Sequence, residues 1–164
     1  MSRAVLSIGS NIGDRFAHLQ SVVDNLAPHI VSVSPVYRTP PWGPVAQDDF
    51  LNAVLIVDAA DIDAAGWLAR GQQLEQAADR LREVRWGPRT LDVDVVAVDG
   101  VTSADPVLTL PHPRAAERAF VLIPWLAVDP AATVAGVAVE DLVAALPAAD
   151  RDTVRAIDRQ LALR

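Results

Sequence analysis

The chain has 164 residues, 51% of them hydrophobic, with a formal net charge of -7 and a sequence pI near 4.8, so it is acidic and has ample material for a core. It contains no cysteine and no lysine, which excludes disulfides, thiolate metal sites, a P-loop lysine and a Schiff base. Because a nonspecific nucleic-acid binder needs a basic surface, no nucleic-acid partner is expected.

The length is that of one ordinary domain, so residues 1–164 are expected to form a single unit. No apolar run is long enough for a membrane span, and the N-terminus lacks the basic, apolar and small-residue order of a secretion signal. We therefore expect a cytoplasmic monomer with small-molecule partners and no membrane contact.

The first hundred residues predict strands and helices in the order βαββαβ. Short β-rich runs predict strands at residues 3–8, 30–37, 52–57 and 91–98. Helical spacing of apolar residues predicts helices at 15–26 and from an Asp61 N-cap to about Leu81. This order fits an α+β, ferredoxin-like sandwich with an antiparallel sheet and both helices on one face.

The rest of the chain is expected to decorate this core. Residues 107–110 predict an edge strand, and residues 115–128 predict a mostly apolar helix that is interrupted or ends near Pro124. Beyond it we expect a short hairpin from Thr133, a helix near 139–146 and a final helix near 151–163.

Residues 85–94, Arg-Trp-Gly-Pro-Arg-Thr-Leu-Asp-Val-Asp, put two arginines before two aspartates. On a strand, Asp92 and Asp94 would share one face while Val93 and Val95 point into the core. Paired carboxylates suit Mg²⁺, which completes its shell with water and substrate phosphates. A solvated strand face is the alternative for this pair.

Four arginines lie within ten residues of one another, at Arg80, Arg82, Arg85 and Arg89. This local concentration of positive charge in an acidic chain favours a compact anionic ligand.

A proline-rich loop, residues 39–44, precedes the third predicted strand. Its prolines fix the backbone, so carbonyls and the remaining amides can face a ligand. Phe50 and Asn52 follow on one strand face and offer an aromatic plane and an amide that both donates and accepts. These groups suit a flat heterocycle. Alternatively, Phe50 is a core aromatic and Asn52 a strand cap.

Three further features carry weaker signals. Gln72 and Glu75 share a helix face with Arg82 and could reach a nucleotide, although such faces are more often a solvent-exposed stripe. His112 lies in a proline-bounded turn and can donate to phosphate, but it lacks partners for zinc. Residues 9–13 are interpreted chiefly as a turn, because they have neither the lysine nor the glycine spacing of a phosphate loop.

Several blocks taken together resemble the family of 6-hydroxymethyl-7,8-dihydropterin pyrophosphokinase, an enzyme of folate biosynthesis. The resemblance spans about residues 6–130, and its blocks are residues 6–11, 37–44, 50–53, 85–94 and 110–112. It implies the ferredoxin-like fold. It also implies transfer of the terminal pyrophosphoryl unit of ATP to the pterin hydroxymethyl group, with release of AMP.

The resemblance also implies roles for individual residues. Asp92 and Asp94 would hold two Mg²⁺ ions that bridge the ATP phosphates. The pterin ring would lie between Phe50 and Phe120, with Asn52 at its edge. Further pterin contacts would come from Thr39, Pro40, Trp42, Gly43 and Trp86. ATP would contact Gln72, Glu75, Arg82, Arg85, Trp86, Arg89, Val95, Thr109, His112 and Arg118. The catalytic cations would be Arg80, Arg82 and Arg89.

Two other functions remain open on the sequence alone. One is a catalytically silent pterin- or nucleotide-binding module, although such a module does not need a pair of metal-binding carboxylates such as Asp92 and Asp94. The other is a structural α+β interaction domain, but clustered arginines and a Pro-Pro-Trp loop do not help to build a core. Release of ADP rather than AMP would indicate an ordinary kinase.

Overall fold

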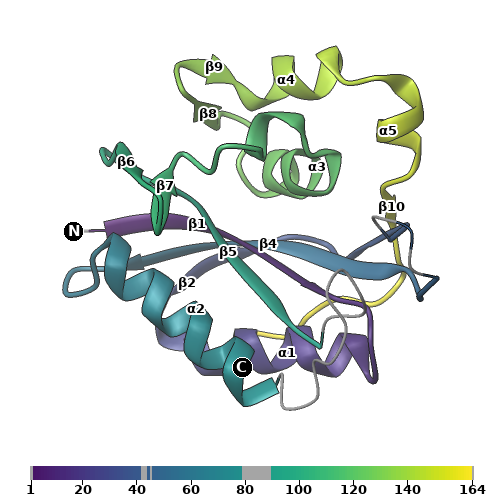
Figure 1. Ribbon diagram of the computed structural model, residues 1–164, viewed down its shortest axis with the longest axis horizontal. Coiled ribbons are helices and arrows are strands. Elements are labelled where there is room, and N and C mark those ends of the chain that lie inside the picture. The colour runs from purple at the N-terminus through teal and green to yellow at the C-terminus, as the bar shows by residue number, and fades with distance from the viewer. Residues whose placement is uncertain (1, 42–43, 45, 79–89, 164) are drawn as a thin grey trace.

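The computed structural model (Figure 1) describes residues 2–41, 44, 46–78 and 90–163, and it has three layers. The helices are α1 (Arg15–Leu26), α2 (Ala64–Ala78), α3 (Ala119–Val128), α4 (Val139–Ala145) and α5 (Ala148–Asp152). α1 and α2 cover one face of a central antiparallel sheet, and α3, α4 and α5 lie over the other. In the described parts of the chain, no helix combines the length and apolar character needed to cross a membrane.

The central sheet is organised around its first strand. Its strands are β1 (Ser2–Ser10), β2 (Ile30–Val33), β3 (Tyr37–Thr39), β4 (Phe50–Ala59), β5 (Asp92–Val98) and β10 (Arg155–Ala156). β1 lies between β4 and β5, while β2 and β3 both pair with β4, and β10 adds to the edge of β3. All of these pairs are antiparallel. The predicted α+β class, with α1 and α2 on one face of an antiparallel sheet, is confirmed.

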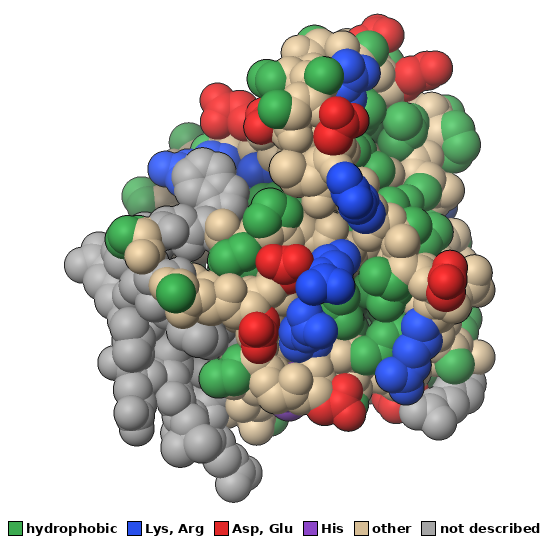
Figure 2. Space-filling model, turned by 90° about the vertical axis from the view of Figure 1, so that its right-hand side faces the viewer, with side chains coloured by type: hydrophobic (Ala, Val, Ile, Leu, Met, Phe, Trp, Pro, Cys, Tyr) green, Lys and Arg blue, Asp and Glu red, His purple; other side chains and the backbone are tan. Residues whose placement is uncertain are grey.

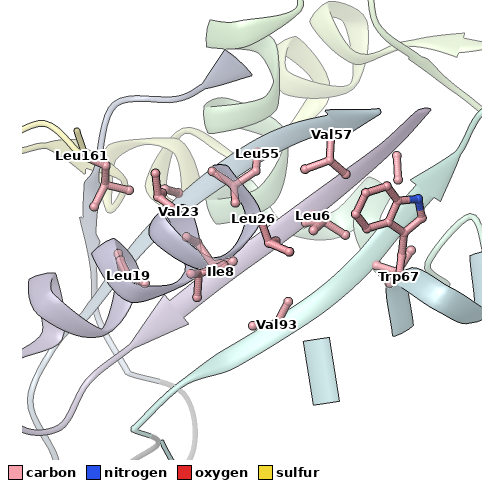
Figure 3. Close-up of a cluster of buried hydrophobic side chains, with 14 of the residues drawn as sticks. Leu6, Ile8, Leu19, Val23, Leu26, Leu55, Val57, Trp67, Val93 and Leu161 are labelled. Atoms are coloured by element: carbon pink, nitrogen blue, oxygen red, sulfur yellow. The ribbon is translucent and has the colours of Figure 1, made fainter. Parts of the chain in front are cut away.

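Hydrophobic side chains cover both faces of the sheet. Leu6 and Ile8 of β1 point towards α1 and α2, where they join the cluster that Figure 3 shows. Val5 points to the opposite face and packs with α3 and α4. Because β1 is buried on both faces, it carries apolar residues at the consecutive positions 4–6 in place of a strict alternation of apolar and polar residues. Each such buried side chain contributes about 1.5–3 kcal/mol to folding.

The single strand predicted over residues 30–37 is wrong, because β2 and β3 are separate. At the break, the Ser34 backbone N–H donates to the Val54 carbonyl over 2.9 Å. The Ser34 hydroxyl accepts from the Val54 N–H over the same 2.9 Å. Pro35 has no N–H to donate to a ladder, so it interrupts the strand.

The expected cap of the second helix was also wrong. α2 begins at Ala64, and the Asp63 carboxylate rather than Asp61 accepts from the Gly66 N–H over 2.8 Å. An N-cap oxygen must reach the amide three residues further on, which fits Asp63. The predicted end near Leu81 lies outside the described residues.

Two short segments differ from their predicted form. Gly9 and Ser10 were expected in a turn but continue β1 to its end. The expected edge strand at 107–110 is β7 (Leu108–Leu110), which pairs with β6 (Ser103–Asp105) in a separate hairpin. That hairpin is closed locally by the Asp105 carboxylate, which accepts from the Val107 N–H over 2.9 Å.

The region after β7 agrees only partly with prediction. The expected break near Pro124 is wrong: α3 runs through this buried proline to Val128, and its apolar packing offsets the lost hydrogen bond. The hairpin of β8 (Thr133–Val134) and β9 (Val137–Ala138) and the following α4 are confirmed.

The helix predicted over residues 151–163 is wrong, because the chain there forms the end of α5, then β10, and then irregular structure. Instead, Leu161 inserts into the core beside Leu19 and Val23 of α1 (Figure 3).

Gln20 of α1 holds the C-terminal segment through a two-way hydrogen bond. Its side-chain amide donates to the Ala162 carbonyl over 2.7 Å and accepts from the Ala162 N–H over 2.9 Å. Nearby, the Arg159 guanidinium lies 3.8 Å from the Phe16 ring centroid. These contacts join residues far apart in sequence, so they stabilise the final segment as part of the domain.

We expect Gln20→Leu to lower the free energy of unfolding by about 1–3 kcal/mol, because it leaves a backbone donor and acceptor of Ala162 without their partners. Urea denaturation measures this difference. Gln73→Leu, at an exposed position of α2, is the matched control. Equal unfolding free energies for the two variants would contradict the role of the Gln20 contact.

Candidate active site

A cavity of about 770 Å³ lies on the α3 face of the sheet. Its walls come from the ends of β3, β4 and β5, the segment before α3, and α3 and α5. The lining residues are Thr39, Pro40, Gln47, Phe50, Asn52, Asp92, Asp94, His112, Arg114, Glu117, Arg118, Phe120 and Asp150. Segments that are far apart in the sequence, from Thr39 to Asp150, therefore meet at this cavity.

Strand register sets the floor of the cavity. Gly9 of β1 is the partner of Asn52 in β4 and of Asp92 in β5. Neighbouring strands lie about 4.8 Å apart, so Asn52 and Asp92 are separated by roughly 10 Å across the sheet. One amide and one carboxylate therefore face the same cavity at a separation that accommodates a small ring and its substituent.

Asp92 and Asp94 both line the cavity from β5. Val93 and Val95, which alternate with them, are buried in the cluster on the opposite face, as predicted. Among the described residues, no group of three or more His, Cys, Asp or Glu side chains could hold a metal by itself. Two carboxylates nevertheless fit Mg²⁺, which usually takes much of its shell from water and substrate phosphates.

Glu75 of α2 supports the start of β5. Its Oε2 accepts from the Val93 N–H over 3.1 Å, and its carboxyl is hydrogen-bonded to Asp92. Burial raises the pKa of Glu75 to about 7; the Val93 hydrogen bond lowers it, while the charges of Asp92 and Asp94 raise it. A protonated Glu75 can donate to Asp92, and so can fix the orientation of that carboxylate.

The pKa of Glu75 predicts a pH dependence of stability. A carboxyl whose pKa is raised in the fold contributes stability below its unfolded pKa and loses it as pH rises through the folded value. In metal-free buffer, the free energy of unfolding should fall as pH rises from 4.5 to about 7. Glu75→Gln should flatten this interval in urea denaturation. Glu140→Gln, at an exposed position of α4, is the control, and identical pH profiles for both variants would refute the assignment.

Asn52 is fixed by a neighbouring strand. Its side-chain nitrogen donates to the Thr39 hydroxyl over 2.6 Å, and both residues are buried. An amide has two N–H donors and an acceptor oxygen, so this bond uses one donor and fixes the plane of the group. Phe50, two residues earlier on β4, lines the same cavity. This local arrangement favours a flat, polar-edged ring.

A short loop beside the cavity is anchored by three side chains. Asn11 donates to Gln47 Oε1 over 2.6 Å, and Arg15 donates to the Asp49 carbonyl over 2.8 Å. Arg38 forms an ion pair with the Asp49 carboxylate, with 2.9 Å between Nε and Oδ2. These contacts tie the loop to the end of β1, to α1 and to β3. Figure 2, viewed from the side of α5 and β10, shows arginine and acidic side chains interspersed over that face.

His112 is held in one tautomer. Its backbone N–H donates to the Val96 carbonyl over 2.7 Å, and its Nδ1 accepts from the Arg114 N–H over 3.2 Å. Burial lowers the pKa of His112, as do Arg118 and Arg114, while Asp92 raises it. The neutral ring therefore carries its proton on Nε2, which can donate to an anionic ligand.

Arg118 and Phe120 form the wall towards α3. The Arg118 guanidinium lies 5.6 Å from the Phe120 ring centroid, within the range of a cation–π contact. Both side chains are half-buried and line the cavity. Phe120 therefore contributes an aromatic surface to the same cavity as Phe50.

The structure brings most of the described candidate residues together. The cavity lining includes Thr39, Pro40, Phe50, Asn52, Asp92, Asp94, His112, Arg118 and Phe120. Four candidates do not line it: Gln72 is exposed on α2, Glu75 contacts Asp92 from behind, Val95 is in the core, and the Thr109 hydroxyl donates to the Asp105 carbonyl. Candidates outside the described residues are Trp42, Gly43, Arg80, Arg82, Arg85, Trp86 and Arg89.

Sequence reasoning missed four lining residues, Gln47, Arg114, Glu117 and Asp150. Arg114 had a local signal, because it follows the His112-Pro113 turn and adds a cation there. Asp150 had none, since its position depends on α5 folding back over the sheet. The long-range contact of Gln47 with Asn11 was likewise invisible in the sequence.

Comparisons with known proteins agree on one family. The family model of 7,8-dihydro-6-hydroxymethylpterin-pyrophosphokinase matches residues 5–130. A protein of Mycobacterium tuberculosis strain H37Rv, named 2-amino-4-hydroxy-6-hydroxymethyldihydropteridine pyrophosphokinase, is 52% identical, with 94% of this chain and 89% of the relative covered. A protein of the same name from Methylorubrum extorquens is 43% identical, with 89% and 94% covered.

A solved structure supports the fold. The crystal structure of a Plasmodium falciparum HPPK-DHPS with pterin and p-hydrobenzoate aligns with a TM-score of 0.70 at 13% identity. The alignment covers 87% of this chain, which spans 41% of that longer chain. At this identity the likeness concerns the fold alone.

Proposed function

Because the chain belongs to the 7,8-dihydro-6-hydroxymethylpterin-pyrophosphokinase family, we propose that it transfers pyrophosphate from ATP to 6-hydroxymethyl-7,8-dihydropterin in folate biosynthesis. The observation that carries this proposal is the meeting of the Asp92–Asp94 pair with the Asn52–Thr39 pair in one cavity. The first pair suits metal-bound phosphates and the second suits a ring edge.

The pterin occupies the cavity between Phe50 and Phe120. Both side chains line it, from β4 and α3 respectively, and aromatic planes favour stacking on a flat ring. The Asn52 amide, oriented by Thr39, reads the ring edge through its second N–H and its oxygen. The hydroxymethyl group then points across Gly9 towards Asp92 and Asp94. By resemblance, Trp42, Gly43 and Trp86 also contact the pterin, and Pro40, which lines the cavity, is a further contact.

Asp92 and Asp94 are the residues that would hold two Mg²⁺ ions. Bound magnesium would neutralise the phosphate oxygens of ATP and help to orient the triphosphate. Glu75 keeps the Asp92 carboxylate in place by a hydrogen bond. The protein thereby contributes mainly positioning and charge, which is what phosphoryl transfer requires.

In the reaction, the pterin hydroxyl oxygen attacks the β-phosphorus in line with the bond to the α-phosphate. A new O–Pβ bond forms, the bond from Pβ to the bridging oxygen breaks, and AMP leaves with that oxygen. His112 and Arg118 also line the cavity, where the His112 Nε2–H and the Arg118 guanidinium can face the negative charge of the phosphates. Arg80, Arg82 and Arg89 are proposed to add cations as the transfer occurs.

No side chain is assigned as the general base. Asp94 lies nearest in principle, but a carboxylate that binds metal is a weak base, so the hydroxyl proton passes to water or to phosphate. ATP contacts are further proposed for Gln72, Arg85, Val95 and Thr109, by resemblance alone.

The direct test is to incubate the protein with ATP, Mg²⁺ and 6-hydroxymethyl-7,8-dihydropterin, and to separate the nucleotides by chromatography. AMP should form only when the pterin is present. ADP would instead identify an ordinary kinase, and pterin binding without any nucleotide product would identify a silent binding module.

A further inference from the structure

Gly9 lies beneath the candidate pterin pocket, between the strand that carries Asn52 and the strand that carries Asp92. A Cβ atom placed on Gly9 would lie only 2.8 Å from the Asn52 side-chain oxygen. Carbon and oxygen atoms that are not bonded do not approach so closely without displacement. The Asn52 amide can therefore occupy its present position because Gly9 has no side chain.

The requirement for glycine at this position is steric. Three described glycines, Gly13, Gly100 and Gly136, have positive φ angles, but Gly9 does not. Its backbone belongs to the extended strand β1, which any residue can adopt. Alanine at position 9 would therefore suit the backbone and would conflict only with its neighbours in space.

The conflict concerns one side chain. The other close neighbours of the added Cβ are the Leu51 carbonyl and Phe50 Cδ1, each at an ordinary 3.6 Å. All three neighbouring atoms belong to β4, and none belongs to the metal-binding strand β5. The Asn52 amide must therefore move, although it is buried and bonded to the Thr39 hydroxyl over 2.6 Å.

We propose that Gly9 is a positioning residue for substrate recognition: its bare Cα leaves the space that the Asn52 amide needs to face the edge of the pterin ring. This inference rests on the proposed function, because it concerns the same pocket. It assigns to Gly9 control over recognition of the ring, separate from the binding of metal and ATP on the other side of β1.

Steady-state kinetics of Gly9→Ala, Asn52→Ala and the double variant test the proposal. Gly9→Ala should lower kcat/KM for the pterin roughly tenfold, which corresponds to about 1.4 kcal/mol lost through crowding of the Asn52 amide. KM for ATP should stay within about twofold of the wild-type value. In the Asn52→Ala background the same change should have almost no further effect, because the atom that it crowds is gone.

Gly66→Ala provides a matched control for crowding. Gly66 lies in the first turn of α2, and its added Cβ would lie 2.9 Å from Ile62 Cγ2. This position is far from the pocket: the neighbouring Trp67 donates a hydrogen bond to Ser2, at the opposite end of β1 from Gly9. This variant should keep the wild-type kcat/KM for the pterin. An equal loss in Gly9→Ala and Gly66→Ala would overturn the proposal, as would the same loss from Gly9→Ala with and without Asn52.

A second readout does not depend on the reaction. Asn52 is one of three asparagines in the chain, so its side-chain NH₂ signals can be assigned in an NMR spectrum by comparison with Asn52→Ala. Gly9→Ala should shift these signals more than those of Asn11 and Asn25. Unshifted Asn52 signals would refute the positioning role, whereas a wild-type protein that makes no AMP would refute the proposed function and leave this result intact.

Folding supplies the remaining check. If Gly9→Ala does not fold, the double variant with Asn52→Ala should recover the wild-type circular dichroism spectrum. Failure of the double variant to fold would contradict the proposal, because crowding would then extend beyond the Asn52 amide.

Discussion

Asp94→Asn is expected to lower kcat with ATP, Mg²⁺ and the pterin about a thousandfold, because metal-assisted charge stabilisation is worth several kcal/mol and each 1.36 kcal/mol changes the rate tenfold. Asp94 lines the cavity from β5 on the same face as Asp92. The asparagine amide keeps the shape of the aspartate carboxylate but lacks its negative charge. The loss should therefore appear in turnover while the fold is maintained.

Rates measured by AMP formation across a magnesium titration provide the test. Asp99→Asn is the matched control, because Asp99 follows the same strand but is exposed and outside the cavity lining. The control should keep the wild-type rate, and both variants should show the wild-type circular dichroism spectrum. Wild-type turnover by Asp94→Asn at saturating magnesium would refute the metal assignment.

The second large effect is expected at Asn52. Asn52→Leu should lower kcat/KM for the pterin about a hundredfold or more, because a site built to hydrogen-bond a ring loses discrimination when its polar group is removed. Leucine has the same branch at Cγ but no polar atom, and Gly9 has no side chain that would crowd it. Asp92 and Asp94 on β5, the proposed metal ligands, are untouched, so KM for ATP should change little.

Asn25→Leu is the control for this substitution, since Asn25 is an exposed residue of α1 that donates to the Ser21 carbonyl over 2.7 Å. It should behave as the wild type in the same assay. A loss of ATP affinity in Asn52→Leu equal to the loss for the pterin would contradict the assignment of Asn52 to the ring.

Local patterns in the sequence were sufficient for much of the fold. Alternation along residues 91–98 predicted the strand that aims Asp92 and Asp94 at the cavity, and helical spacing predicted α1 at its observed bounds, Arg15–Leu26. Each of these elements buries one consistent set of side chains, so its period is present in the sequence itself.

Elements that depend on distant partners could not be predicted in this way. The final helix was wrong because Leu161 packs against α1 and Ala162 bonds to Gln20, 142 residues away. The break between β2 and β3 depends on a Ser34 hydroxyl that bonds to another strand. In both cases tertiary contacts overrode the local periodicity.

The candidate site likewise contains residues that local sequence patterns predicted and residues that only long-range packing brings to the cavity. The Asp-x-Asp pair, Phe50 and Asn52 carried local signals, and the cavity contains all of them. Asp150 and Gln47 reach it only through the packing of α5 and of the loop that Asn11 anchors. The steric role of Gly9 needed the register of β1 with β4 and therefore could not be inferred from the chain alone.

The central claim, transfer of an intact pyrophosphoryl group, is tested most directly by ³¹P NMR of the complete reaction with ATP, Mg²⁺ and 6-hydroxymethyl-7,8-dihydropterin. The account predicts one AMP singlet for each pair of coupled doublets from a pterin diphosphate ester. Formation of ADP together with a pterin monophosphate would contradict it, because attack would then have occurred at the γ-phosphorus.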